Sequence, residues 1–273
     1  MMMYTLRILP LLLLLCVLPA RSQELEPAPH RQPTSQAVLF GIGRTNQYDT
    51  YLSPLEYKGV QASFLTQRER MTHLFSRRLS FQSTLQGAFT HTKNPAGTAF
   101  DWGGRIAYDA GWHYHHSLAK GLSVKGGLLL GTDLGFLYNN RNGNNPAQGH
   151  LSIDASLSAG GDYSFRLWRL PLRVGYQADL PVAGVIFSPE FGESYYEMSQ
   201  HGVGKNILFA HPGNALSLRQ LLTFDVCFRR TTLRLAYLSD IRQSNTNQIA
   251  YHDISRSFML GFVRHFQLLQ KKK

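Results

Sequence analysis

The sequence predicts an all-β protein: a closed antiparallel transmembrane β-barrel of about ten strands with up-and-down topology. Apolar and polar residues alternate with a period of two over most of the chain, and tight turns alternate with longer loops. Only 16% of the 273 residues are charged and aromatic residues are frequent, which excludes a disordered chain. The one long apolar run of the sequence covers residues 8–19, so a bundle of membrane-spanning helices is excluded as well.

The start of the chain predicts export. Arg7 precedes the apolar run, and residues 20–22 (ARS) match the small-x-small pattern after which a signal peptidase cuts. The run is too short to span a bilayer whose apolar core is about 30 Å thick, so residues 1–22 are expected to be a signal peptide. Residues 23–35 are polar and contain three prolines, which predicts a periplasmic linker before a barrel over 36–273.

Residues 99–116 show the alternation most clearly. Even positions from Phe100 to Tyr114 are apolar, aromatic or glycine, whereas odd positions carry Asp, Arg, His, Ala or Gly. An α-helix would spread both sets around its circumference, so the pattern predicts a strand with two distinct faces. The other predicted strands share this alternation with varying regularity: 36–44, 56–68, 78–91, 122–138, 150–165, 169–182, 214–228, 232–242 and 252–266.

A soluble β-sandwich would also alternate, with its apolar face directed inward. The length of the strands and the position of the aromatic residues favour a lipid-facing barrel over this alternative. A tilted membrane strand needs about 9–11 residues, and aromatic side chains gather where a barrel meets the membrane interface. The predicted interface residues lie near the ends of the apolar faces: Trp102, Trp112, Tyr114, Tyr138, Tyr163 and Phe266.

The lengths of the connections predict an orientation. Loops expected at 45–55, 92–98, 139–149, 184–213 and 243–251 alternate with turns expected at 69–75, 118–121, 166–168 and 229–231. Short periplasmic turns and longer outer loops are typical of bacterial outer-membrane barrels, and an even number of strands returns both termini to the periplasm. The sequence therefore predicts a protein of the bacterial outer membrane with both termini periplasmic.

The expected partners follow from charge and from the last strand. The net charge is +11 at pH 7 with His neutral, and an exported basic protein is expected to meet the lipid bilayer and lipopolysaccharide phosphates, not nucleic acid. Residues 257–266 (SFMLGFVRHF) place aromatic and apolar side chains on one face. This segment resembles the C-terminal sorting signal of bacterial outer-membrane proteins, which implies recognition by the outer-membrane assembly machinery.

Two segments carry a further resemblance. Residues 49–59 (DTYLSPLEYKG) resemble the first-loop segment of an uncharacterised outer-membrane β-barrel family from Bacteroidota, a domain of unknown function. Residues 181–197 (PVAGVIFSPEFGESYYE) are similar to the long loop of the same family. The resemblance covers nearly the whole chain after the signal peptide and implies location and fold, but no reaction.

The polar faces of the strands predict a charged lumen. Because ten strands enclose only a narrow space, charges of both signs inside it are expected to pair with one another. The predicted network consists of Arg78, Arg105, Asp109, Lys125, Asp154, Arg173, Asp179, Arg219 and Arg234. The alternative for the same residues is a narrow path for a solute.

The sequence contains one candidate for chemistry and predicts no cofactor and no metal site. His150 and Ser152 resemble the His-x-Ser pair of small outer-membrane barrels that deacylate lipid A, in which His activates Ser for attack on an ester. That pair faces lipid in those enzymes, whereas the alternation here directs both residues into the lumen. We therefore expect a non-enzymatic barrel with a structural, binding or narrow-channel role; the alternative is a lipid-modifying esterase using His150 and Ser152.

The 184–213 segment is the best candidate for recognition. Long loops in compact proteins are usually functional or packed against another part of the molecule. Its apolar and aromatic residues are consistent with two arrangements, a lid folded into the lumen or an exposed contact surface.

Overall fold

The structure, a computed structural model, describes residues 33–228 and 231–267. The described strands are β1 (Pro33–Asp49), β2 (Ser53–Met71), β3 (Leu79–Lys93), β4 (Phe100–Ala119), β5 (Leu122–Asn139), β6 (Ala147–Leu167), β7 (Leu170–Phe187), β8 (Ile207–Ala210), β9 (Ser217–Cys227), β10 (Thr232–Thr246) and β11 (Ile249–Gln267). Short helical segments occur at η2 (Leu74–Arg77), α2 (Tyr195–His201) and η3 (Gly204–Asn206). None of the described helices is long and apolar enough to cross a bilayer.

Two of the predicted boundaries fall at the start of the chain. The predicted signal peptide, residues 1–22, lies outside the described residues, as does most of the predicted linker. The strand β1 begins at Pro33, inside the linker expected at 23–35, because this end of β1 pairs with the end of β11.

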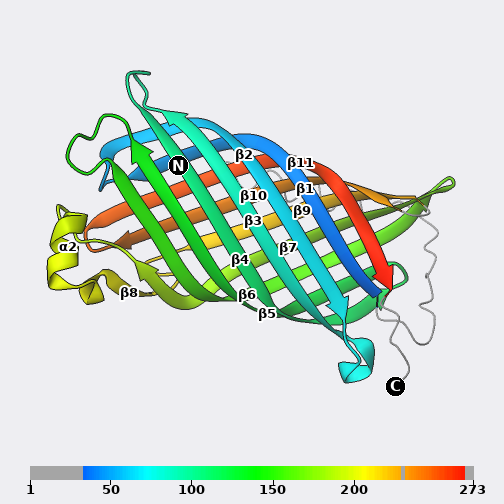
Figure 1. The fold of residues 1–273 in the computed structure, drawn as a ribbon. Coiled ribbons are helices and arrows are strands. Elements are labelled where there is room, and N and C mark those ends of the chain that lie inside the picture. The colour runs from blue at the N-terminus through cyan, green and yellow to red at the C-terminus, as the bar shows by residue number, and fades with distance from the viewer. Residues whose placement is uncertain (1–32, 229–230, 268–273) are drawn as a thin grey trace.

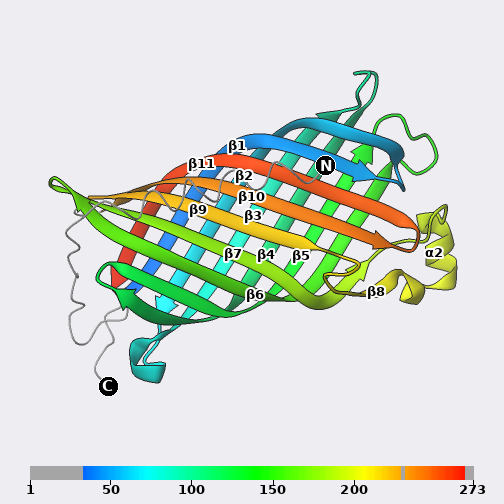
Figure 2. The same ribbon diagram turned by 180° about the vertical axis from the view of Figure 1, so that it is seen from behind.

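All the long strands of the described chain join into one closed ring. Their order is β6-β5-β4-β3-β2-β1-β11-β10-β9-β7, and the pairing of β6 with β7 closes the ring of ten. Every pairing is antiparallel, and the strands are tilted relative to the long axis (Figures 1 and 2). The predicted closed, antiparallel, up-and-down barrel is thus confirmed.

The barrel has two unlike ends. One end carries α2 and the connection 188–216, and we name it the loop end (Figure 1). The other end carries the first residues of β1, the last residues of β11 and the connections 72–78, 120–121 and 168–169. We name it the turn end. The small strand β8 extends the barrel wall at the loop end by pairing with the last residues of β7.

Two of the predicted loops are mostly strand. Residues expected to form loops at 45–55 and 243–251 continue the strands on either side, which leaves turns only at 50–52 and 247–248. Asn247 and Gln248 both have positive φ, 50° and 62°, as a two-residue hairpin turn requires. The expected contrast between long and short connections is therefore concentrated in the segment 188–216.

The two faces of each strand have opposite environments. In β5, Leu129 is 1% exposed, whereas its neighbours Leu128 and Leu130 are 61% and 70% exposed. The same alternation directs Asp, Arg, Gln and Ser side chains inward and aliphatic and aromatic side chains outward along the other strands. The protein is therefore apolar outside and largely polar inside, the reverse of a soluble β-sandwich.

The predicted interface aromatics lie mostly on the outer wall. The exposed members of the set are Trp102, Trp112, Tyr114 and Tyr138. Tyr163 is half-buried and stacks on Phe165, with 5.6 Å between ring centroids. The backbone of Phe266 lies in β11 opposite Thr34.

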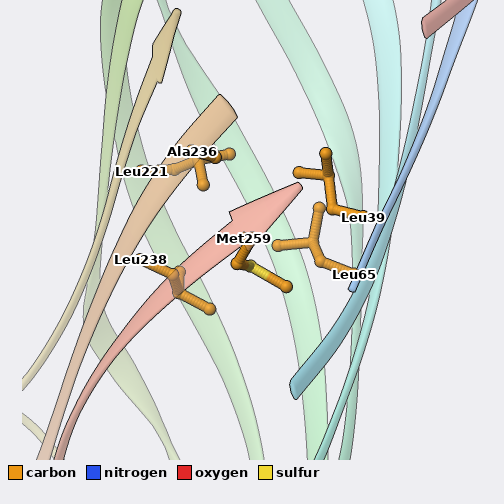
Figure 3. Packing of buried hydrophobic residues seen from close by; sticks show 6 residues of the cluster. All are labelled: Leu39, Leu65, Leu221, Ala236, Leu238 and Met259. Carbon is orange, nitrogen blue, oxygen red and sulfur yellow. The ribbon is translucent and has the colours of Figure 1, made fainter. Parts of the chain in front are cut away.

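One part of the lumen is apolar, which the sequence did not predict. Leu39, Leu65, Leu221, Ala236, Leu238 and Met259 form a buried cluster contributed by β1, β2, β9, β10 and β11 (Figure 3). We name it the apolar layer. At Gly261, a Cβ atom would lie 1.9 Å from the backbone oxygen of Val38, so only glycine permits the close approach of β1 and β11 beside this layer.

Candidate functional site in the barrel lumen

Arg105 is the centre of an ion-pair network that crosses the lumen. It extends from β4 to Asp240 on β10, with 2.6 Å between guanidinium and carboxylate. These two strands lie on opposite sides of the described ring. Arg105 also approaches Asp133 at 3.6 Å and Asp253 at 3.9 Å, and its side chain is only 9% exposed. Because three carboxylates surround this guanidinium, its charge is compensated inside the barrel.

Two further arginines extend the network. Arg219 on β9 pairs with Asp109 on β4 and with Asp179 on β7, the latter at 2.8 Å. Arg242 on β10 lies 2.8 Å from Asp133 on β5. We name this set, with Arg105 and its partners, the central network.

Little space is left inside the central network. Asp154 accepts a hydrogen bond from Ser156 at 2.8 Å and borders a cavity of about 30 Å³ beside Arg242. A second cavity, of about 20 Å³, borders Arg105 and His150. A water molecule needs at least about 10–15 Å³ of such space, so these cavities are too small for an organic solute. The network thus fills the lumen as an apolar core fills a soluble protein.

The mouth at the loop end is closed by an inward-folded turn. Tyr51 and Leu52, between β1 and β2, pack against Leu137 and Ile249 inside the barrel, and Tyr251 lies against the same cluster. We name this cluster the mouth plug.

A lid covers the mouth plug. The hydroxyl of Tyr51 donates to the backbone oxygen of Glu193 at 2.9 Å, and the hydroxyl of Tyr195 donates to Gln148 on β6 at 3.0 Å. Strands β1 and β6 lie on opposite sides of the described ring, so the segment around residues 193–195 bridges the mouth. Asn247, in the β10–β11 turn, donates to the backbone oxygen of Ser188 at 2.8 Å and holds the base of the lid.

The lid has a packed inner face and an exposed outer face. Met198 in α2 is 2% exposed, whereas Phe191, Tyr196 and Phe209 are strongly exposed. The segment therefore covers the mouth and does not enter the lumen, and the contact surface expected on its outer side stays a prediction. Ser194 caps α2 by accepting from the backbone N–H of Glu197, which fixes where the helix begins.

The contacts of the lid change the acidity of Tyr51. Burial raises the pKa of Tyr51 to about 12, and the nearby Tyr195, Asp49, Glu193 and Glu197 add to this shift. The neutral phenol that donates to Glu193 is therefore favoured over the phenolate throughout the physiological range.

The turn end of the lumen contains a polar vestibule of about 100 Å³ below the apolar layer. Lys125 reaches Glu69 at 3.2 Å and Gln82 at 2.8 Å, and Arg234 binds Asp225 through two contacts of 2.7 Å. Arg173 forms the longest of these ion pairs, with 3.9 Å between its guanidinium and the carboxylate of Asp162. Each positive charge of the vestibule has its own acidic partner, so the cavity carries no strong excess of either sign.

Eight of the nine residues of the predicted charge network line the lumen. The members inside the lumen are Arg105, Asp109, Lys125, Asp154, Arg173, Asp179, Arg219 and Arg234. Arg78 is the exception: it is exposed in the β2–β3 connection and donates to the hydroxyl of Tyr114 at 3.3 Å. The chain leaves the strand conformation at Thr72, so the inward and outward alternation no longer applies at Arg78.

Some charged residues of the lumen were missed. Among them, Arg242, Asp253 and Glu69 lie within one residue of the predicted strand ends at 242, 252 and 68. Continuing the alternation inward at every second residue would have found each of them, because Arg242 follows Asp240 and Asp253 precedes Ser255 on the same face.

The predicted esterase pair is placed on the lumen wall. His150 stacks on Tyr251 with 4.2 Å between ring centroids, and its Nε2 lies 3.2 Å from the carboxylate of Asp49. Ser152 lies two residues further along β6 on the same inward face. Both side chains are thus separated from the apolar exterior by the barrel wall. Among the described residues, no group of three or more His, Cys, Asp or Glu side chains could hold a metal ion.

The fold and lumen define a class of protein: a closed antiparallel β-barrel with an apolar exterior and a charged, filled interior. The chain belongs to the family described as "Protein of unknown function (DUF3316)", whose model matches residues 8–273. The predicted membership of a family of unknown function is thereby confirmed, while the Bacteroidota origin and the two segments said to mark the family stay predictions. No curated protein sequence matches the chain.

Solved outer-membrane barrels are similar in shape. The outer membrane protease OmpT from Escherichia coli has a TM-score of 0.46 at 8% identity, over 90% of this chain and 100% of that one. The transport unit of the autotransporter AIDA-I from Escherichia coli has a TM-score of 0.41 at 11% identity, over 88% and 92%. The β domain of the Bordetella autotransporter BrkA has a TM-score of 0.42 at 11% identity, over 85% and 100%. Identity this low transfers neither an activity nor a binding partner.

Proposed function

We propose that the protein is a non-enzymatic, non-conducting barrel of the bacterial outer membrane, whose lumen holds the fold together and whose loop end carries the contacts with other molecules. The observation that carries this proposal is the succession of three barriers along one lumen: the mouth plug, the central network and the apolar layer. A channel for a solute needs a continuous path, and each barrier closes it by different means.

The exterior of the barrel supports membrane insertion. Large apolar side chains are exposed all around the ring, including Ile42, Leu130 and Phe258 at 77%, 70% and 73% exposure. A soluble monomer rarely exposes a continuous apolar band, whereas a barrel in lipid requires one. The closed ring also leaves no strand edge unpaired in the hydrocarbon.

Orientation and lipid partners are further parts of the proposal. The long segment at the loop end favours this end as the outer one, with both termini periplasmic. Outward-facing Arg44 and Arg256 are direct neighbours across β1 and β11. Like charges in such a pair repel, so phosphates of lipopolysaccharide in the outer leaflet are their expected counter-charge.

The last strand supports the predicted link to the outer-membrane assembly machinery. In β11, Phe258, Leu260 and Phe262 are all exposed on the outer face, and the strand pairs with β1 along its full length. As the last strand of the chain, β11 pairs with the first strand, β1, and its apolar outer face is the part that the assembly machinery would recognise.

Two measurements test the proposal. Folded barrels in detergent migrate differently on a gel before and after boiling, and we expect this shift. The refolded protein is then inserted into planar bilayers beside a porin as positive control. We expect no stepwise conductance from a sample that shows the gel shift. Regular conductance steps would overturn the non-conducting role, and a missing shift would overturn the membrane barrel.

The esterase hypothesis makes a different prediction. If His150 and Ser152 deacylate lipid A, Ser152→Ala changes the acylation pattern of lipid A in cells that express the protein. The inward position of both residues supports the expectation that wild type, Ser152→Ala and a control lacking the protein give identical patterns by mass spectrometry. A pattern specific to the wild type would favour the enzyme.

A further inference from the structure

A hollow of about 460 Å³ lies in the outer wall of the barrel at the turn end. It is bounded by Arg68, Arg70 and Thr72 at the end of β2, by Phe81 and Ser83 on β3, and by Tyr108 and Trp112 on β4. All three strands present these residues outward, so the hollow faces the surroundings of the barrel and not the lumen. We name it the β3 groove.

Small residues in the middle of the wall create the groove. Ser83 on β3 is paired in register with Arg68 on β2 and with Ala110 on β4. The short side chain of Ser83 forms the floor, and the long side chains on β2 and β4 form two walls. Phe81 closes one end by packing edge-to-face on Trp112, with 5.0 Å between ring centroids.

One wall of the groove is positively charged and lacks a counter-charge. Arg68 and Arg70 alternate with Glu69, so both point outward on the same face of β2 and both are exposed. Neither forms a hydrogen bond or an ion pair with any residue that the structure describes. The intervening Glu69 points into the lumen, where it is engaged by Lys125 and His115. Two neighbouring guanidinium groups thus face one hollow with no acid beside them.

The opposite wall is aromatic. Tyr108 and Trp112 are both exposed on the outer face of β4, with one outward-facing residue between them. Aromatic side chains of this kind sit at the level of lipid head groups, with their rings against the first part of the acyl chains. Guanidinium groups bind phosphate through paired N–H donors. The groove therefore combines a phosphate-binding wall with a wall suited to glycerol and acyl groups.

We propose that the β3 groove binds one phospholipid with a net-negative head group from the membrane leaflet at the turn end, with its phosphate held by Arg68 and Arg70 and its glycerol and upper acyl chain along Tyr108 and Trp112. This inference rests on the proposed insertion of the barrel in a membrane. A phospholipid fits better than a peptide, because the groove lies within the apolar wall and continues into exposed hydrocarbon-facing residues such as Leu85.

Tryptophan fluorescence can test the groove directly. The chain has three tryptophans, so Trp102→Phe with Trp168→Phe leaves Trp112 as the sole reporter. The protein is refolded into mixed vesicles that contain phosphatidylglycerol and phosphatidylcholine, with bromine on the acyl chains of one lipid at a time. We expect brominated phosphatidylglycerol to occupy the site next to Trp112 about fivefold more often than brominated phosphatidylcholine. A preference of this size corresponds to the attraction between one basic residue and an anionic lipid.

Matched variants separate the groove from general charge. Arg68→Gln with Arg70→Gln removes the charged wall, and we expect the preference to fall to about one. Arg44→Gln with Arg256→Gln removes the same charge from the outer wall near the other end, and we expect the preference at Trp112 to stay. Ser83→Phe fills the floor while keeping both arginines, and we expect it to abolish the preference as well, so the test remains available if the double arginine variant does not fold.

The outcomes distinguish the two proposals. If neither brominated lipid quenches Trp112, the barrel is not in the bilayer and the proposed function fails. If both lipids quench it equally in the wild-type background, the barrel is inserted but the groove has no preference, which overturns this inference alone. A preference that survives Arg68→Gln with Arg70→Gln, or that disappears in Arg44→Gln with Arg256→Gln, also overturns it.

Discussion

The lumen is filled in two different ways along one barrel. Near the loop end, the central network closes it with arginines and aspartates that meet across the ring, whereas nearer the turn end the apolar layer closes it with Leu, Ala and Met. An apolar layer tolerates imperfect contacts at the cost of a small cavity, while a buried charge is tolerated only with its partner in place. The two halves of the lumen should therefore respond differently to substitution.

The largest effect is expected in the central network. Asp240 is 2% exposed and contacts Arg105 at 2.6 Å and Gln86 at 2.8 Å. Asp240→Asn keeps the shape of the side chain but removes the negative charge next to the Arg105 guanidinium. We therefore expect a loss of about 3–5 kcal/mol in the free energy of unfolding. Urea unfolding in vesicles, followed by tryptophan fluorescence, measures it. The outward-facing Ser239→Ala is the control, and equal stabilities of the two variants would contradict the network.

A smaller but clear effect is expected in the apolar layer. Leu39 and Leu65 are direct neighbours across β1 and β2, and both are buried. Leu65→Ala should lower the free energy of unfolding by about 2–3 kcal/mol through lost burial and a residual cavity. The double variant with Leu39→Ala should lose less than the sum of the single losses, because the two side chains share one cavity. Strict additivity would show that they do not pack together.

The lid should respond to alkaline pH. The pKa of Tyr51 is raised to about 12, compared with about 10 in an unfolded chain, so the folded state holds the phenolic proton more tightly. Its contribution is complete below pH 10 and is lost as the pH rises from 10 towards 12. Protease cleavage within residues 188–216 should therefore become faster over this range.

Tyr51→Phe provides the comparison for that pH profile. It removes the hydrogen bond to Glu193, at a cost of about 1 kcal/mol in the docking of the lid, and it should flatten the rise in cleavage between pH 10 and 12. Tyr57→Phe is the control, because the buried Tyr57 side chain donates its hydroxyl to Ser53 and not to a residue of the lid. An unchanged profile in Tyr51→Phe would assign the alkaline response to another group.

The smallest effect is expected at Arg78. Its side chain is exposed in the β2–β3 connection, and a surface contact such as the one with Tyr114 contributes little. Arg78→Ala should leave the free energy of unfolding unchanged within error, in contrast to the inward-facing arginines. A loss comparable to that of Asp240→Asn would place Arg78 in the lumen after all.

Sequence reasoning succeeded where the information is local. Alternation located every long strand to within a few residues, because the side chain of each strand residue points opposite to that of its neighbours. It failed where local patterns are ambiguous. Leu128, Leu129 and Leu130 are consecutive leucines, so hydropathy alone cannot show that the middle one faces inward. The sequence did not predict the apolar layer for the same reason. An inward-facing Leu interrupts the run of polar residues by which the inward face of a strand is recognised.

The sequence by itself determined that this chain forms a ring of alternating strands with polar residues towards its axis. Only the tertiary structure decided that Arg105 meets Asp240, that Arg219 meets Asp109, and that the segment around Glu193 bridges the mouth. The physical reason is range: which face a residue occupies depends on its neighbours in the chain, whereas its partner across the lumen depends on strand number, tilt and register around the whole ring.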